Sequence, residues 1–234
     1  MMKKEGELDN VGYYSDWAVY AEVADTKNLY STMSSKWTVP PAPKKWGPAG
    51  LSSVYIFNGL EDGGGVHGKS SLILQPVVQY GKSGCLNDPL LWHEWHLTSY
   101  LVDGNGRAHC GKRIYVDEGD VVFAGMVQVD KEQNSWEVTS IREKTGETSK
   151  YTGVLGANKK IDAAYLTLEG MVIYNCQTWP SNSGIEFTDN ILIDGNGKTI
   201  SGETWVPEIR HKECNQHVTV EKNGNVQLNY DSTM

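Results

Sequence analysis

Residues 72–80 run Leu-Ile-Leu-Gln-Pro-Val-Val-Gln-Tyr, and this stretch is the strongest single indication of the fold. Apolar residues flank Gln75 on both sides, which predicts a buried strand that carries an amide. A primary amide has two hydrogen-bond donors and two acceptor sites, and each needs a partner when the group is buried. Gln75 therefore either bonds to a neighbouring strand or points into a groove where water or a substrate satisfies it.

The rest of the chain has the rhythm of antiparallel β-structure, with almost no helical periodicity. Short β-rich runs alternate with turn signals such as Asp103–Gly106, Glu118–Asp120, Lys144–Gly146 and Asp194–Gly197. The runs predict strands at 14–22, 52–59, 70–80, 92–102, 113–116, 121–129, 135–142, 148–153, 163–174, 184–187, 191–193 and part of 217–229. This pattern predicts an all-β fold: an antiparallel β-sandwich, a concanavalin-like jelly roll of two curved sheets with a concave substrate groove.

The length fits one domain, because all-β sandwiches reach about 200–250 residues as single units and this chain has 234. Residues 1–12 are polar and predict a flexible N-terminal segment, followed by a single β-sandwich domain over residues 13–234. Trp and Tyr, at 8 and 12, outnumber Phe at 3. Their polar tips suit a partly wet binding groove, although exposed strand faces also accommodate them.

Charge and hydropathy argue against two classes of partner. The net charge of −8, with 21 scattered Lys and Arg residues, argues against nucleic acid, whose backbone requires clustered cations. No apolar run approaches the ~18 residues of a membrane span, and no signal peptide is visible behind Met1–Glu7.

The four cysteines permit three pairings; Cys85 and Cys110 lie in Gly-rich loop sequence and are able to bridge, but sequence does not choose among the pairings. Oligomeric state is open.

Three polar residues on three predicted strands are candidates for one site. Because side chains alternate along a strand, Gln75 and Gln79 share one face, and Trp92, Glu94 and His96 share another. Glu169 shares a third with Tyr165 and Thr167, among other residues. If these faces line one side of a curved sheet, Gln75, Glu94 and Glu169 converge. A carboxyl near aromatic surface favours its neutral form and suits acid–base chemistry, and an adjacent amide is able to hold water and stabilise an oxyanion.

Several motifs resemble, in order, those of the glutamic endopeptidases, the fungal acid proteases called eqolisins. The resemblance covers roughly residues 35–193 and rests on Trp37-Thr38-Val39-Pro40, Ile73-Leu74-Gln75, Trp92-His93-Glu94-Trp95, Gly119-Asp120-Val121, the hairpin from Trp136 to Gly146, Leu168-Glu169, and Trp179-Pro180 followed by Ile185–Thr188. Two departures bear on activity. Gly170 stands where the family has Trp after its catalytic Glu, and Gln79 stands where it has Asp.

The resemblance implies a hydrolase that cleaves peptide bonds at acid pH, with Gln75 and Glu169 activating water. It implies supporting or substrate-binding roles for Glu94, Trp92, Trp95, Gln79 and Trp37, a polypeptide substrate, no cofactor, and secretion. Two alternatives remain: a non-catalytic module that binds glycan or peptide in an aromatic groove, and a glycoside hydrolase that uses Glu94 and Glu169.

A metal site is not expected. The spacing His211-x-x-Cys214-x-x-His217 supplies three soft ligands without a fourth nearby, which is a weak signal. His93 and His96 fall on opposite faces of a strand, so they are not placed to share a metal.

Overall fold

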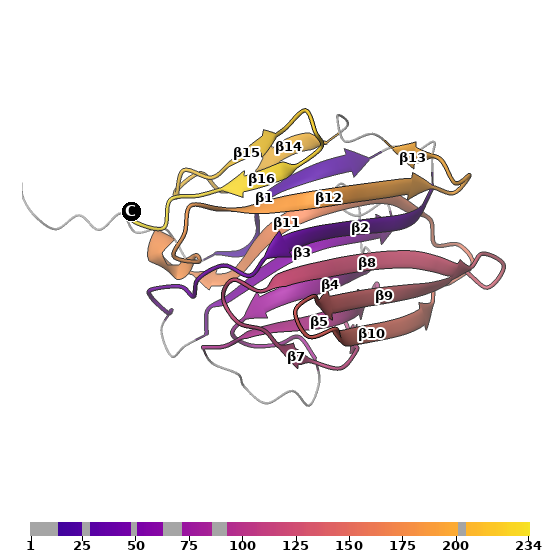
Figure 1. Cartoon of the computed structure of the whole chain (residues 1–234), viewed down its shortest axis with the longest axis horizontal. Helices are drawn as coiled ribbons and strands as arrows, with labels where there is room; N and C mark the ends of the chain where they lie inside the picture. Colours follow the sequence, from indigo (N-terminus) through magenta and orange to yellow (C-terminus); the bar gives the residue numbers. More distant parts are fainter. Residues whose placement is uncertain (1–13, 25–28, 48–50, 63–71, 86–92, 201–204) are drawn as a thin grey trace, which may run out of the picture.

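The computed structural model describes residues 14–24, 29–47, 51–62, 72–85, 93–200 and 205–234. Over these residues the chain is built from antiparallel strands in two stacked sheets, which lie one behind the other in Figure 1. One short 3₁₀ turn, η2 (Cys176–Thr178), is also present. The predicted β-sandwich is thus confirmed. No helix among these residues is long and apolar enough to cross a membrane.

The first sheet carries the strand that contains Gln75. Its order is β14 (Val206–Ile209), β1 (Tyr14–Ala24), β11 (Ile161–Ile173), β3 (Ser53–Asp62), β4 (Ile73–Tyr80), β5 (Trp95–Val102) and β6 (Ala108–Cys110), and β7 (Ile114–Tyr115) also pairs with β5. The strands nearest in sequence are not always neighbours: β1 and β3 both pair with β11. The first sheet therefore forms only when distant segments meet.

The second sheet has the order β10 (Glu147–Val154), β9 (Ser135–Arg142), β8 (Val121–Asp130), β2 (Tyr30–Thr38), β12 (Gly184–Asp194), β16 (Val226–Asn229) and β15 (His217–Val220), with β13 (Thr199–Ile200) beside β12. Its centre, β2, pairs with β8 on one side and β12 on the other. The last strands of the chain are divided: β14 extends the first sheet, whereas β15 and β16 extend the second.

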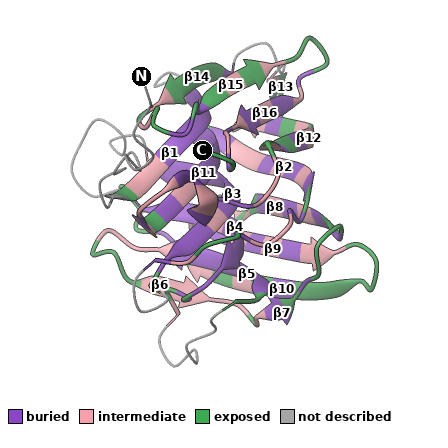
Figure 2. Cartoon of the chain, turned by 90° about the vertical axis from the view of Figure 1, so that its left-hand side faces the viewer, coloured by how far each residue is buried: buried purple, intermediate pink, exposed green. Residues whose placement is uncertain are grey.

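The main core lies between the sheets and follows the period of two expected of strands. In β4, Leu74 and Val78 face the second sheet, and in β11, Leu166 and Leu168 do so. A smaller apolar cluster lies on the opposite face of the first sheet, around Phe57 and Tyr100. We call this the outer face. Figure 2 shows that burial concentrates in the middle strands, whereas β14 and β15 are largely exposed.

Most predicted strands are present, and the differences have physical causes. Strand β2 was not predicted, because serines interrupt its apolar alternation; one of them, Ser35, is fully buried. The two short runs predicted at 184–187 and 191–193 form one strand, β12, with an irregularity between Thr188 and Ile191. The predicted turns are confirmed, with left-handed backbone at Gly106, Gly119, Gly146 and Gly197.

Two disulfides settle the cysteine pairing that the sequence left open. Cys85 bonds to Cys110, and Cys176 bonds to Cys214. Because the Cys214 thiol is consumed in this bond, the His211–His217 spacing does not form the metal site considered above. The segment 1–12, predicted to be flexible, lies outside the described residues.

Candidate active site

The outer face of the first sheet gathers polar side chains among aromatic rings. Register places them in transverse rows, each row taking one residue from each of β1, β11, β3, β4 and β5. One row runs from Trp17 through Glu169 and Tyr55 to Gln79 and His96. A second row contains Glu22, Tyr165 and Gly59, and at its other end Gln75 faces Tyr100.

The local sequence around Gln75 opens the pairing between β3 and β4. Phe57 pairs with Val77 and Leu60 with Leu74, but the two residues between them on each strand are not paired. Pro76 has no N–H to donate to β3, which accounts for the gap. Gly59 faces Gln75 across this gap, and a Cβ added at Gly59 would lie 3.1 Å from Cδ1 of Ile73. Gln75 is half-buried and so remains accessible from the outer face.

Gln75 and Glu169 share the outer face, as predicted, but the register does not place them side by side. Glu169 faces Tyr55, which faces Gln79, four residues along β4 from Gln75. Four residues span about 13 Å and two strand spacings add about 9.6 Å, so their Cα atoms lie about 16 Å apart. The register thus offsets the backbone positions of the two residues. The pair of Gln75 and Glu169 sharing one water stays a prediction.

Glu169 has its own charged neighbours. Burial and then the negative charge of Asp16 raise the pKa of the Glu169 carboxyl to about 7, against a hydrogen bond from Trp17 that lowers it. Asp16 is held in turn by the Arg210 guanidinium, whose Nη1 lies 2.8 Å from Oδ1. The Arg210 guanidinium also lies 5.9 Å from the centre of the Trp17 ring. Glu169 is thus a half-buried acid that stays protonated up to near-neutral pH.

Gln79 has the structural role that a buried amide requires. It is fully buried, its Nε2 donates to the Lys82 carbonyl at 2.8 Å, and its Oε1 accepts a hydrogen bond from the Tyr100 hydroxyl. Tyr100 also contacts the Ser83 hydroxyl at 2.9 Å. These bonds occupy the Gln79 side chain, so it supports the sheet beneath the outer face.

The remaining predicted residues do not gather around Gln75. Glu94 is exposed and precedes β5, and its negative charge, after burial, helps raise the pKa of Tyr80 to about 12. Trp95 is buried in the core between the sheets, on the other face of β5. Trp37 lies in β2, which belongs to the second sheet, and its side chain is also buried in this core. It therefore does not lie on the outer face of the first sheet with Gln75. Trp92 lies outside the described residues.

The structure brings one carboxylate that the sequence reasoning missed, Glu61, close to Gln75, and places another, Glu22, farther along the same face. Glu61 on β3 pairs with Ile73, two residues from Gln75 on the same face of β4, so Glu61 and Gln75 are diagonal neighbours with Cα atoms about 7–8 Å apart. Glu61 is 3% exposed, and Glu22 is 9% exposed. The sequence contains a signal for Glu61, which lies four residues after Phe57 and two after Gly59 and so shares their face of the strand. It was missed because the strand was predicted to end at residue 59.

Tyr165 lies on β11, between the strands that carry Glu22 and Glu61, and faces Gly59 at the gap. Burial first, and then the charges of Glu61 and Glu22, raise the Tyr165 pKa, and a hydrogen bond links its side chain to Glu61. Its ring packs edge-to-face on Trp17, with centroids 4.9 Å apart. Tyr165 thus stays protonated and is a hydrogen-bond donor at the centre of the outer face. In the described part of the chain, no three His, Cys, Asp or Glu residues are grouped as a metal site would need.

Comparison with solved structures finds glutamic peptidases whose fold is similar to that of this chain. Scytalido-glutamic peptidase bound to a peptide-based transition-state analogue superposes with a TM-score of 0.64 at 15% identity, covering 94% of this chain and all of the other. SCP-B, a member of the eqolisin family bound to the tripeptide Ala-Ile-His, gives 0.60 at 15% identity. SCP-B is covered completely and this chain to 94%.

Aspergilloglutamic peptidase from Aspergillus niger gives a TM-score of 0.52 at 16% identity over 75% of this chain and 98% of the other. At such identities the likeness establishes the fold, and it confirms that the motif order was a sound guide to it. No family profile matches the sequence, and no curated protein matches it in sequence. The terminal regions before residue 30 and after residue 205, for which the sequence offered no counterpart, contribute strands to both sheets.

Proposed function

We propose that the chain is a peptidase-like hydrolase that binds an extended polypeptide on the outer face of the first sheet. The fold supports this proposal, because its structural neighbours are glutamic peptidases, two of them bound to peptide ligands. The observation that carries it is the diagonal placement of Glu61 beside Gln75, at the gap that Pro76 and Gly59 open in the sheet. A carboxylate and an accessible amide at one opening are the groups that water activation needs.

In the proposed reaction the Gln75 amide oxygen holds the attacking water, and the Glu61 carboxylate takes its proton as the water oxygen bonds to the peptide carbon. The amide N–H group of Gln75 donates to the oxyanion that forms. Glu61 then returns the proton to the leaving nitrogen as the C–N bond breaks. Tyr165, bonded to Glu61, positions that carboxyl. Glu169, about 16 Å away by the strand spacings, lies where it contacts the substrate chain outside the reacting bond.

The proposal is tested with denatured protein substrates between about pH 3 and pH 8. We expect Gln75→Ala to lower kcat/KM by about 10²–10³, because it removes the oxyanion donor. Glu61→Gln removes the acid–base group and should cost about 10²–10⁴. Because both act on one water, the double variant should lose little more than the worse single variant. Glu132→Gln, on an exposed turn of the second sheet, is the matched control and should be neutral.

Three outcomes discriminate among the alternatives. If Glu169→Gln abolishes cleavage while Glu61→Gln does not, the pair implied by the family motifs is correct and Glu61 is structural. Wild-type protein that cleaves no polypeptide but binds peptide or oligosaccharide would identify a binding module. Release of sugar would point to a glycoside hydrolase. Circular dichroism establishes that each variant is folded.

Secretion is also part of the proposal. Both disulfides join segments more than twenty residues apart, at sequence separations of 25 and 38. Structural disulfides persist in oxidising compartments and are rare in the cytosol.

A further inference from the structure

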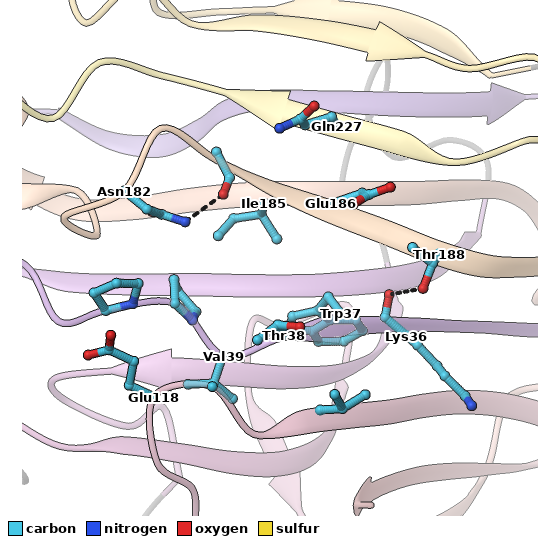
Figure 3. Close-up of a pocket in the computed structure, with 15 residues that line it drawn as sticks. Lys36, Trp37, Thr38, Val39, Glu118, Asn182, Ile185, Glu186, Thr188 and Gln227 are labelled. Carbon is cyan, nitrogen blue, oxygen red and sulfur yellow. Dashed lines mark hydrogen bonds between the residues drawn. The ribbon is translucent and has the colours of Figure 1, made fainter.

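The second sheet is split at one end, between β2 and β12. The two strands pair from Asp194 with Tyr30 as far as Thr188 with Lys36, and there their pairing ends. Beyond that point β12 pairs with β16 instead, over Gly184–Phe187. Figure 3 shows the two strands diverging, with the Thr188–Lys36 hydrogen bond at the end of the paired region.

Backbone N–H and C=O groups point into the split from both of its sides. Val39 directs its backbone toward β8, because its N–H donates to Asp120 at 2.8 Å and its carbonyl accepts from Gly119 at 2.9 Å. Backbone groups alternate in direction along a strand, so those of Thr38 point into the split. On the other side Thr188 pairs toward Lys36, so by the same alternation Glu186 also directs its backbone into the split.

A pocket of about 540 Å³ occupies the split, a volume within the range of natural ligand sites. Its floor is apolar: Trp37, Val39 and Ile185 line it and are each at most 2% exposed. The Trp37 indole N–H is buried there, and no acceptor for it exists among the residues that the structure describes. A buried donor of this kind is costly unless a partner meets it.

The rim of the pocket is negatively charged. Glu118 and Glu186 line it and are exposed. The cation of the lining, Lys36, is bound by two carboxylates that lie outside it, with Nζ 2.8 Å from Glu143 and 3.6 Å from Asp189. The two rim carboxylates therefore favour a cationic partner over an anionic one.

From these features we infer that the split binds a short extended peptide with alternating apolar and basic side chains. An inserted strand completes the interrupted pairing with Thr38 and Glu186, as in other cases of strand addition to a sheet. Because its side chains alternate, the apolar ones point to the floor at Trp37 and Ile185 and the basic ones to the rim carboxylates. This site lies on the second sheet and does not depend on the proposed peptidase activity of the first.

The probe is the peptide acetyl-Lys-Val-Lys-Val-amide, titrated against the Gln75→Ala protein so that the outer face does not cleave it. Binding is followed by calorimetry and by the indole N–H resonance of Trp37, assigned with Trp37→Phe. We expect a saturable shift of that resonance. Glu118→Lys and Glu186→Lys should each weaken binding by about tenfold. Glu221→Lys, an exposed change outside the pocket lining, is the matched control and should bind normally.

Two further peptides test the mode of binding. Acetyl-Glu-Val-Glu-Val-amide should bind at least about tenfold more weakly if the rim charges select the ligand. Methylation of the backbone nitrogens that face the strands should abolish binding, because it removes the hydrogen bonds to β2 and β12. Equal binding of the methylated or the acidic peptide overturns the inference, and so does an unmoved Trp37 resonance. Glu118 lies in an exposed turn, so its variant retains the fold even if the strand variant does not.

Discussion

The Glu169 carboxyl is held in an environment that disfavours its charge, and this makes protein stability depend on pH. Burial and the charge of Asp16 raise its pKa to about 7, whereas an unfolded Glu titrates at about 4.3. Between these values the folded state binds more protons than the unfolded state. The free energy of unfolding contributed by this group therefore falls as pH rises through that interval.

We predict that Glu169→Gln makes the protein more stable relative to wild type at pH 8 than at pH 5. The difference should be about 1–3 kcal/mol, reduced from the full shift because the side chain is half-buried. Urea unfolding at the two pH values measures it. Asp16→Asn is the companion variant: removing the like charge should lower the Glu169 pKa and shrink the difference. An unchanged pH dependence in Glu169→Gln would show that this carboxyl titrates normally.

At the residue scale the sequence indicates which side chains share a face but not which of them meet. Gln75 and Glu169 lie on the outer face as alternation predicts, yet the pairing of β11 with β3 and of β3 with β4 offsets them by four residues. Register depends on partners far apart in the chain, and a single sequence contains no direct measure of it. Glu61 was missed for the same reason: its importance comes only from being placed beside β4.

At the scale of elements, the turns and most strands could be predicted because their signals are local. Gly106 and Gly119 adopt left-handed backbone that other residues rarely accept, and the sequence shows them directly. Strand β2 could not be predicted, because its buried Ser35 looks like a surface residue in the sequence. Tertiary packing, not local propensity, makes β2 the centre of its sheet.

A cluster of buried serines joins the two sheets and illustrates such packing. The Ser99 backbone N–H donates to Ser149 Oγ at 3.0 Å, and its hydroxyl bonds to Ser140 at 2.9 Å. All three are fully buried. Strand β5 of the first sheet is thereby hydrogen-bonded to β9 and β10 of the second. These serines satisfy groups that an apolar core would leave without partners.

We predict that Ser149→Ala destabilises the protein by about 1–3 kcal/mol, because it leaves the Ser99 N–H buried without its acceptor. Thr148→Ala, at the exposed neighbouring position on β10, should change stability by no more than about 0.5 kcal/mol. Chemical denaturation of both variants gives the comparison. Equal effects would mean that the serine cluster contributes no more than a surface hydroxyl does.

On the scale of the whole molecule, the C-terminal segment connects the two sheets. After β11 and β12 have entered different sheets, residues 205–234 add β14 to the first sheet and β15 and β16 to the second. The turn between β14 and β15 carries Cys214, which is fully buried and bonded to Cys176, the first residue of η2. A single covalent bond thus fixes the segment that spans the edge of the sandwich.

Removing this disulfide should loosen the C-terminal segment more than the rest of the molecule. For the separation of 38 residues, chain entropy gives a stabilisation of about 4 kcal/mol, and burial of both cysteines adds a cavity cost when they become Ala. The Cys176→Ala/Cys214→Ala variant should therefore lose more stability than Cys85→Ala/Cys110→Ala, whose cysteines are only half-buried and separated by 25 residues. Amide exchange should accelerate first in β14 and β15, because these two short strands are largely exposed. Equal losses in the two variants, or exchange that accelerates uniformly, would show that packing against β1 and β12 holds the segment without the disulfide.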